Sequence, residues 1–284
     1  MSRIAHLPRP HFDAARRGRG RISLIGAGPG AADLLTLRAV RCLGLADVVF
    51  YDRLVEPEVL THVRSGATRI CVGKEVGAHA WPQPRIDRAI VAAALEGRRV
   101  VRLKSGDPSI FGRAAEEIAA ARAQGIEVEV IPGITAASAA AAELCRPLTE
   151  RGRIDRVVLA TATCRTDDAP PDLGGLVRPG AMLVFYMAMH RLGALSEALA
   201  AAGLGSDHPA TICAEVSRPQ ARSLTTTVGR MAGDCAAAGI TNPAVVMVAV
   251  AKAPGDGTPG LLGQGRGRTS TAAGSQHDPL PSGV

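Results

Sequence analysis

Short apolar segments alternate with helix-forming segments through the first half of the chain. Each apolar segment is continuous, as in VVFY and VVRL, rather than alternating between apolar and polar residues. Strands that are buried on both faces have this character, and helices between them predict a parallel sheet covered on both sides. The expected strands are 22–25, 48–51, 69–72, 100–104 and 127–131. The expected helices are about 33–43, 83–95 and 114–123.

The second half has a different order of elements. After a helix that begins near Thr135, several strands follow one another with little helix between them, which predicts a mixed sheet in a second domain. The expected strands are 157–160, 182–186, 211–216, 224–228 and 244–251, with one helix at about 192–202. We therefore expect an α/β fold with domains at 21–133 and 134–252. A basic tail at 1–20 precedes them, and a tail at 253–284, in which 12 of 32 residues are Gly or Pro, follows them.

Composition limits the classes of function. The formal charge is +7, but residues 1–21 hold six Arg and one Asp, so +5 belongs to this stretch and only +2 to the rest. A nearly neutral body with seven aromatic residues disfavours nucleic-acid binding. No apolar stretch is long enough to span a membrane, and no secretory leader is recognisable. Six dispersed cysteines without a CxxC pair predict neither a metal site nor disulfides, and they indicate the cytoplasm.

The glycine-rich segment LIGAGPGAAD at 24–33 permits two interpretations. Its Gly26-x-Gly28-x-x-Ala31 spacing fits the dinucleotide fingerprint, and Asp52 at the end of the next strand has the position of a ribose-binding acid. Pro29 removes a backbone N–H where a pyrophosphate needs donors. A tight strand-to-helix turn is therefore favoured, and an NAD(P)-binding oxidoreductase remains the alternative.

Further motifs follow in order along residues 21–252. They are VVFYDRLV at 48–55, VGKEVGAHAWPQ at 72–83, VRLKSGDPSIFGRAAEE at 101–117 and VIPGITAASAAAA at 130–142. Together with GAGPG, they resemble the uroporphyrinogen-III C-methyltransferases of the tetrapyrrole methylase family. The resemblance implies a homodimer whose S-adenosylmethionine (SAM) lies in the cleft between two domains and leaves as S-adenosylhomocysteine. It also implies methylation of uroporphyrinogen III at C2 and C7 to precorrin-2, which feeds siroheme or cobalamin synthesis.

The resemblance also implies site residues. The family's proton acceptor and donor correspond to Asp52 and Lys74. The cofactor contacts correspond to Pro29, Ser105, Gly106, Asp107, Ile110, Thr135, Ala136, Met187 and, beside Pro243, Ala244.

The proposed chemistry is consistent with these residue types. A carboxylate such as Asp52 can stabilise the cationic ring that forms on methylation and accept the departing proton, whether or not it also pairs with Arg53 or Lys74. Asp107 before a proline can accept from the cofactor or simply cap an Asx turn. The substrate carries eight carboxylates, and arginine side chains bind carboxylates best because they can form bidentate hydrogen bonds with them. We expect substrate contacts from Arg113, Arg151 and Gln83, and we interpret Arg102 and Lys104 as solvated surface charges.

Departures from the family pattern leave the substrate open. Ser105 replaces a glycine, Glu150 replaces a histidine and would face a polyacid, the segment 159–165 differs, and a glycine expected near Ser217 is absent. A sister methylase acting on a later corrin precursor and a degenerate tetrapyrrole-binding protein are therefore alternatives. No dehydrogenase–chelatase segment precedes the methylase-like region, so we expect a methylase without the other siroheme synthase activities.

Overall fold

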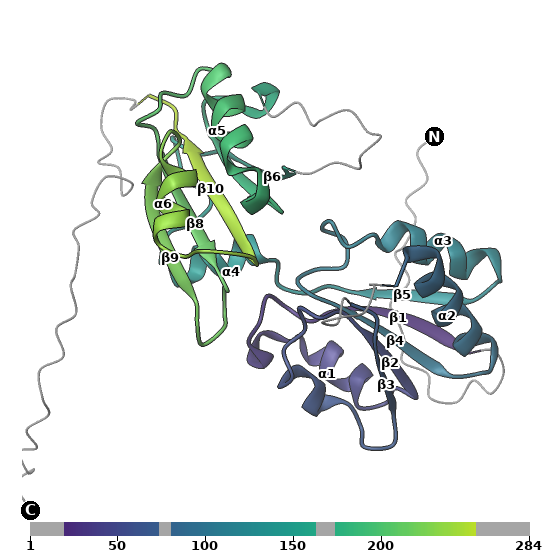
Figure 1. The fold of residues 1–284 in the computed structure, drawn as a ribbon. Helices are drawn as coiled ribbons and strands as arrows, with labels where there is room; N and C mark the ends of the chain where they lie inside the picture. The colour runs from purple at the N-terminus through teal and green to yellow at the C-terminus, as the bar shows by residue number, and fades with distance from the viewer. Residues whose placement is uncertain (1–19, 74–80, 163–173, 254–284) are drawn as a thin grey trace, which may run out of the picture.

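The computed structural model describes residues 20–73, 81–162 and 174–253 of the chain. Two lobes lie side by side, each built on a five-stranded sheet (Figure 1). The chain leaves the first sheet at Ile131 and reaches the first helix of the second lobe at Ala136. The expected two-part α/β architecture is confirmed.

The first sheet is parallel throughout, with the strand order β3-β2-β4-β1-β5. Its strands are β1 (Arg21–Gly26), β2 (Val48–Tyr51), β3 (Thr68–Cys71), β4 (Arg99–Lys104) and β5 (Glu127–Ile131). Helix α1 (Leu37–Leu43) packs on one face, and α2 (Gln83–Leu95) and α3 (Ala114–Ala123) pack on the other. The chain leaves β1 and β4 toward opposite edges of the sheet, so the crevice at their carboxyl ends is the expected place for a ligand.

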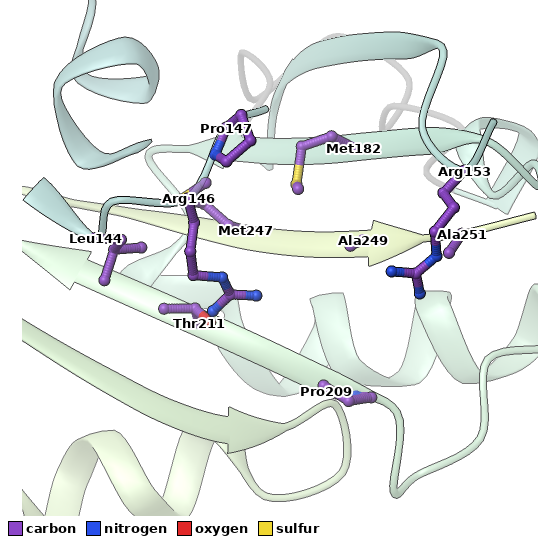
Figure 2. A pocket seen from close by; sticks show the side chains of 10 residues that line it. All are labelled: Leu144, Arg146, Pro147, Arg153, Met182, Pro209, Thr211, Met247, Ala249 and Ala251. Carbon is purple, nitrogen blue, oxygen red and sulfur yellow. Dashed lines mark hydrogen bonds between the residues drawn. The ribbon is translucent and has the colours of Figure 1, made fainter. Parts of the chain in front are cut away.

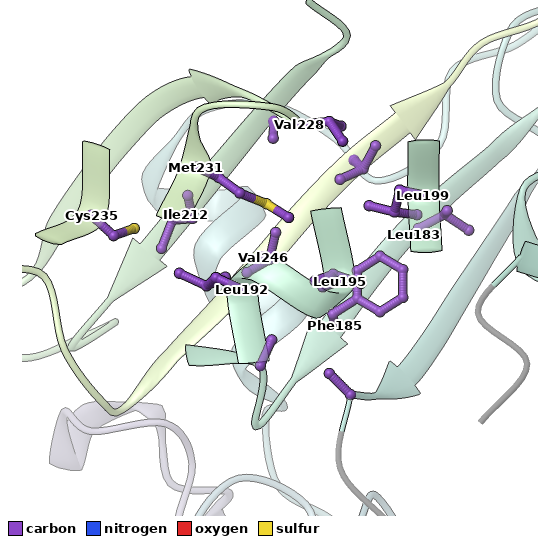
Figure 3. Close-up of a cluster of buried hydrophobic side chains, with 14 of the residues drawn as sticks. Leu183, Phe185, Leu192, Leu195, Leu199, Ile212, Val228, Met231, Cys235 and Val246 are labelled. Carbon is purple, nitrogen blue, oxygen red and sulfur yellow. The ribbon is translucent and has the colours of Figure 1, made fainter. Parts of the chain in front are cut away.

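The second sheet is mixed, as the sequence predicts, with the order β6-β7-β10-β8-β9. Only β6 and β7 pair in parallel. Its strands are β6 (Arg156–Thr161), β7 (Ala181–Tyr186), β8 (Pro209–Ala214), β9 (Arg222–Thr227) and β10 (Ala244–Val250). Helices α5 (Leu192–Ala201) and α6 (Met231–Ala237) cover one face, where Leu183, Phe185 and Leu195 form a core (Figure 3). Helix α4 (Ala136–Glu143) covers the other face.

Two local features differ from expectation. The glycine loop does not open directly into an α-helix: a 3-10 turn (Ala32–Leu34) comes first, and α1 begins only after Thr36, whose hydroxyl accepts from Ala39 N at 3.1 Å. Helix α6 was not expected because it buries only Met231 and Cys235, too few apolar positions to produce a helical period.

Within the described ranges, no helix is long and apolar enough to cross a bilayer.

Candidate active site

Three loops meet backbone to backbone at the carboxyl ends of β1, β4 and β5. Ala27 N donates to Lys104 O at 2.7 Å, and Gly28 and Gly106 exchange hydrogen bonds of 3.2 and 2.7 Å. A Cβ on Gly26 would lie 2.5 Å from Gly133 Cα, so only glycine permits this approach. The glycines are therefore required to bring the loops together.

The same contacts argue against a dinucleotide site. The N–H groups of Ala27 and Gly28 are already used between loops, Pro29 has none, and no α-helix begins at the loop. A pyrophosphate grip needs these donors and a helix N-terminus. The contacts favour a tight turn at GAGPG over a dinucleotide site, but the turn leads into a 3-10 helix rather than directly into α1.

A cleft of about 570 Å³ opens between these loops and the second lobe. Residues of both lobes line it, including the loops that follow β4, β7 and β8. All nine residues to which the sequence assigns cofactor contacts lie on its wall. They are Pro29, Ser105, Gly106, Asp107, Ile110, Thr135, Ala136, Met187 and Ala244.

An aromatic contact joins the lobes across the cleft. The ring of Phe111, from the loop after β4, lies 5.2 Å from that of Tyr186 at the end of β7, tilted by 52°. The Tyr186 hydroxyl accepts from Ala137 N at 3.0 Å and lies 2.6 Å from Thr135 Oγ1. Tyr186 thus fixes the start of α4, and its ring forms part of the apolar wall.

Strained backbone gathers at this cleft. In the described chain, six non-glycine residues have φ in the left-handed region. Phe111 and Met187 line the cleft, at 52° and 54°, and Glu215 and Ser217 flank the lining residue Val216, at 52° and 61°. Such conformations cost about 1 kcal/mol or more each and persist where the surroundings over-determine them, commonly at functional sites.

The Asp107 carboxylate connects two of the loops. Its Oδ1 accepts from Ser109 N at 2.7 Å, and its Oδ2 accepts from Gly133 N at 2.9 Å. The first bond is the Asx turn that is the structural alternative for this residue. A carboxylate has about four acceptor positions, so capacity remains on the cleft side.

A buried ion network lies beside the cleft, under Asp52. Arg102 Nη2 donates to Asp52 Oδ1 at 2.7 Å, and its Nε donates to Glu117 at 3.0 Å. The fully buried Glu117 also accepts from Lys104 Nζ at 2.9 Å and from Gln83 Nε2 at 3.2 Å. Burial opposes the charge of Arg102, but Asp52 and Glu117 outweigh it and raise the pKa of the guanidinium. Burial, reinforced by Arg102, lowers the pKa of Lys104.

This network corrects one expectation. Arg102 and Lys104 are 2% and 4% exposed, so the expectation that they are solvated surface charges is wrong. Among the described residues, Asp52 pairs with Arg102 and not with Arg53, and Lys74, the other expected partner, lies outside them. The sequence VRLK contains two cationic residues, but it does not indicate that the buried Glu117, from another element, balances their charge.

The expected substrate contacts are not among the residues that line the cleft. Gln83 is buried, and its amide donates to Asp87 and Glu117. Arg113 is exposed and pairs with Glu116 at 2.6 Å, and Arg151 is exposed in the turn before β6.

The departures fall partly outside this site. Glu150 pairs with Arg153 at 3.1 Å and is not part of the cleft wall, and the expectation that it faces the substrate stays a prediction. Ser105 lies on the wall, and Ser217 adjoins it. Within the segment 159–165, residues 163–165 lie outside the described residues.

Several lining residues were not anticipated from the sequence. Arg53 and Leu54 directly follow Asp52 in the YDRLV motif, so the motif itself could have indicated them. His190 and Asn242, 2.9 Å apart, and Arg218 carry no comparable local signal.

A separate hollow of about 160 Å³ lies on the second sheet, with Arg146 and Arg153 at opposite ends of its lining (Figure 2). It shares no residue with the cleft.

The part of the chain that the structure describes contains no group of His, Cys, Asp and Glu suited to a metal ion.

Solved structures resemble this fold closely. The uroporphyrin-III C-methyltransferase of Thermus thermophilus, complexed with S-adenosylhomocysteine, has a TM-score of 0.69 and 33% identity, covering 81% of this chain and 92% of its own. A cobalamin biosynthetic enzyme, cobalt precorrin-4 methyltransferase, has a TM-score of 0.72 and 26% identity, with coverages of 81% and 94%.

Sequence relatives agree with this. The siroheme synthase of Zymomonas mobilis is 46% identical over 206 residues, which are 72% of this chain and 44% of that protein. The chain spans about half the length of the curated relatives that it matches. Residues 21–232 match the family described as tetrapyrrole (corrin/porphyrin) methylases. These methylases use SAM, and this chain is a member of the tetrapyrrole methylase family.

Proposed function

We propose that the chain transfers methyl groups from SAM to C2 and then C7 of uroporphyrinogen III, forming precorrin-2. The observation that carries the proposal is the convergence of nine motif residues from five separate segments on one cleft. The cleft lies at the carboxyl ends of β1 and β4, where open α/β sheets bind ligands. We also propose the domain boundaries 21–133 and 134–252 and a homodimer.

The chemistry of the cleft suits SAM. This cofactor has no phosphate, and the loop N–H groups that would hold one are used within the protein. Ile110, Met187 and Val245 offer an apolar surface to an adenosine, and Asp107 offers acceptor capacity to an ammonium or a hydroxyl. When bound, SAM supplies the methyl group.

Asp52 is the proposed proton acceptor. Arg102 holds one of its oxygens, and Glu117 in turn holds Arg102, so the carboxylate has a fixed orientation. Asp52 is about one-third exposed, which leaves it accessible to a substrate. A carboxylate in this position stabilises positive charge on the methylated ring and takes the proton from the adjacent meso carbon. Lys74 remains the proposed donor.

Space for the substrate adjoins the cofactor cleft. A hollow of about 410 Å³ shares Asp107, Ile110 and Thr135 with the cleft and continues to Leu159 on β6. Arg113 and Arg151 remain proposed contacts for the substrate carboxylates. Gln83 suits this role less well because its amide nitrogen serves Asp87 and Glu117.

The test is an anaerobic incubation of the protein with SAM and uroporphyrinogen III. Mass spectrometry and absorbance should detect a product carrying two added methyl groups. If the protein binds SAM but leaves uroporphyrinogen III unmethylated, the proposed substrate is wrong. The likeness to cobalt precorrin-4 methyltransferase makes a later corrin precursor the second candidate, and the same incubation with that precursor tests it.

A further inference from the structure

The loop that follows β8 crosses from the second lobe to the first through Arg218. The side chain of Arg218 is only 7% exposed. Its Nη2 donates to the carbonyl of Leu54 at 2.7 Å, and its Nη1 donates to Glu215 of its own loop at 2.6 Å. Its Nε lies 3.0 Å from Glu56 Oε1 without its N–H being aimed at that oxygen, so this contact is an ion pair rather than a hydrogen bond.

The backbone of this loop is held from two further directions. Ser217 N donates to Glu143 at the end of α4, at 2.5 Å. A Cβ on Gly30 would lie 2.7 Å from Arg218 Cγ and 2.8 Å from Ser217 O, so the loop packs directly on the GAGPG turn. Glu215 and Ser217 keep left-handed backbone here. Strain of this kind survives only where neighbouring contacts fix the chain.

The residues that Arg218 holds belong to the turn that carries Asp52. Val55 N donates to Asp52 O at 3.1 Å, and Leu54 and Glu56 flank Val55. Arg218 and Leu54 both line the cofactor cleft. Nη1 and Nη2 each donate to a protein acceptor and Nε lies in the ion pair with Glu56, so the charge of Arg218 is balanced within the protein and the residue acts through position.

We propose that Arg218 is a positioning residue, which fixes the turn carrying Asp52 against the second lobe and so sets the distance from Asp52 to the cofactor cleft. The inference rests on the proposed function, in which Asp52 acts on a ring beside a methyl donor in this cleft. A misplacement of about 1 Å can cost on the order of 100-fold in rate. A residue remote from the chemistry can therefore control turnover.

The test replaces Arg218 with Met, which keeps an unbranched apolar stem and removes the guanidinium with its contacts. We expect the rate of a single turnover, with both ligands saturating, to fall about 10-fold or more, while calorimetry shows S-adenosylhomocysteine affinity within about 3-fold of the parent. Arg218→Lys should recover part of the rate. Arg222→Met is the matched control, because the exposed Arg222 donates to Ala238 O within the second lobe and should leave the rate unchanged.

Hydrogen exchange separates this inference from the proposed function. Amides in the segment 53–60 should exchange faster in Arg218→Met, and those of β9 should not change. If the parent methylates no tetrapyrrole but this exchange shift appears, the proposed function fails and the positioning role stands. An unchanged rate and unchanged exchange in an active protein would overturn the inference. Should Arg218→Met fail to fold, Glu56→Gln removes only the ion pair and must show the same exchange shift in smaller measure.

Discussion

The two ends of the first sheet each carry an aspartate bound by arginine. They differ in whether one or both of the carboxylate oxygens are occupied. At the amino end, Asp47 accepts from Arg64 at 2.6 Å and from the side chain and backbone of Arg99 at 2.8 to 3.2 Å, which occupies both oxygens. At the carboxyl end, Arg102 binds Asp52 through Oδ1 alone among the described contacts. Arginines bind both oxygens of Asp47, which makes it structural, whereas Asp52 is oriented by one arginine and remains about one-third exposed, so it can do chemistry.

The depth of the supporting charges also differs. Arg64 and Arg99 are about 40% exposed, so solvent screens their attraction to Asp47. Arg102 and Glu117 are buried, and a buried charge is costly unless it is paired. The amino-end cluster therefore tolerates the loss of a member, but the carboxyl-end network does not. The following substitutions test this difference.

Glu117→Gln should give the largest effect. It leaves Arg102 and Lys104 buried with only Asp52 to balance them, and breaking a buried pair costs roughly 3–5 kcal/mol. Urea unfolding should show this loss. Glu116→Gln is the matched control on the preceding residue of α3, since Glu116 forms an exposed pair with Arg113 worth less than about 1 kcal/mol. Equal losses in the two variants would contradict the assigned role of Glu117.

Asp52→Asn should act mainly on turnover, with a smaller loss of stability than Glu117→Gln because the buried Arg102 keeps its ion pair with Glu117. Loss of a positioned acid–base group typically costs about 100-fold or more, which corresponds to about 3 kcal/mol of barrier. We expect calorimetric SAM affinity within about 2-fold of the parent, because Asp52 is not part of the cofactor cleft wall. Asp47→Asn should leave turnover unchanged. If Asp52→Asn retains full turnover, the carboxyl-end aspartate is structural too, and the comparison collapses.

The sequence predicts the elements of both lobes well, because continuous apolar runs and their flanking glycines depend on local chemistry. The bounds of β2, α3 and β5 agree with the expected ranges residue for residue. The motif residues from Pro29 to Ala244 converge as expected because each lies at the start of a helix or strand or in a loop that follows a strand.

Contacts between distant segments could not be predicted in this way. The burial of Arg102 depends on Glu117 from a different element, and the contact of Arg218 with Leu54 spans 164 residues. Neither pair has a local pattern that distinguishes it from ordinary surface charges. The site's supporting residues are therefore less predictable than the residues that face the ligand.

Asp47→Asn should lower stability by about 1–2 kcal/mol at neutral pH, after allowance for solvent screening. The hydrogen bond from the Arg99 side chain is the main reason that the pKa of Asp47 falls from 3.8 to about 2. A lowered folded-state pKa stabilises above pH 3.8, and that contribution is lost as the pH falls toward 2. Urea midpoints measured between pH 5 and pH 2 should fall less in the variant than in the parent. Parallel curves would show that Asp47 contributes nothing through its charge.

Arg64→Met should have the smallest effect. Arg99 still binds both oxygens of Asp47, and Arg64 is 40% exposed, so we expect a loss of about 1 kcal/mol or less. The pKa of Asp47 should rise slightly because one of its cations is gone, so the acid-induced loss of stability should begin at a somewhat higher pH. The corresponding change at the other end, Arg102→Met, removes a partner from both Asp52 and the buried Glu117 and should cost several times more. Similar losses from the two arginine variants would mean that burial does not separate the two ends of the sheet.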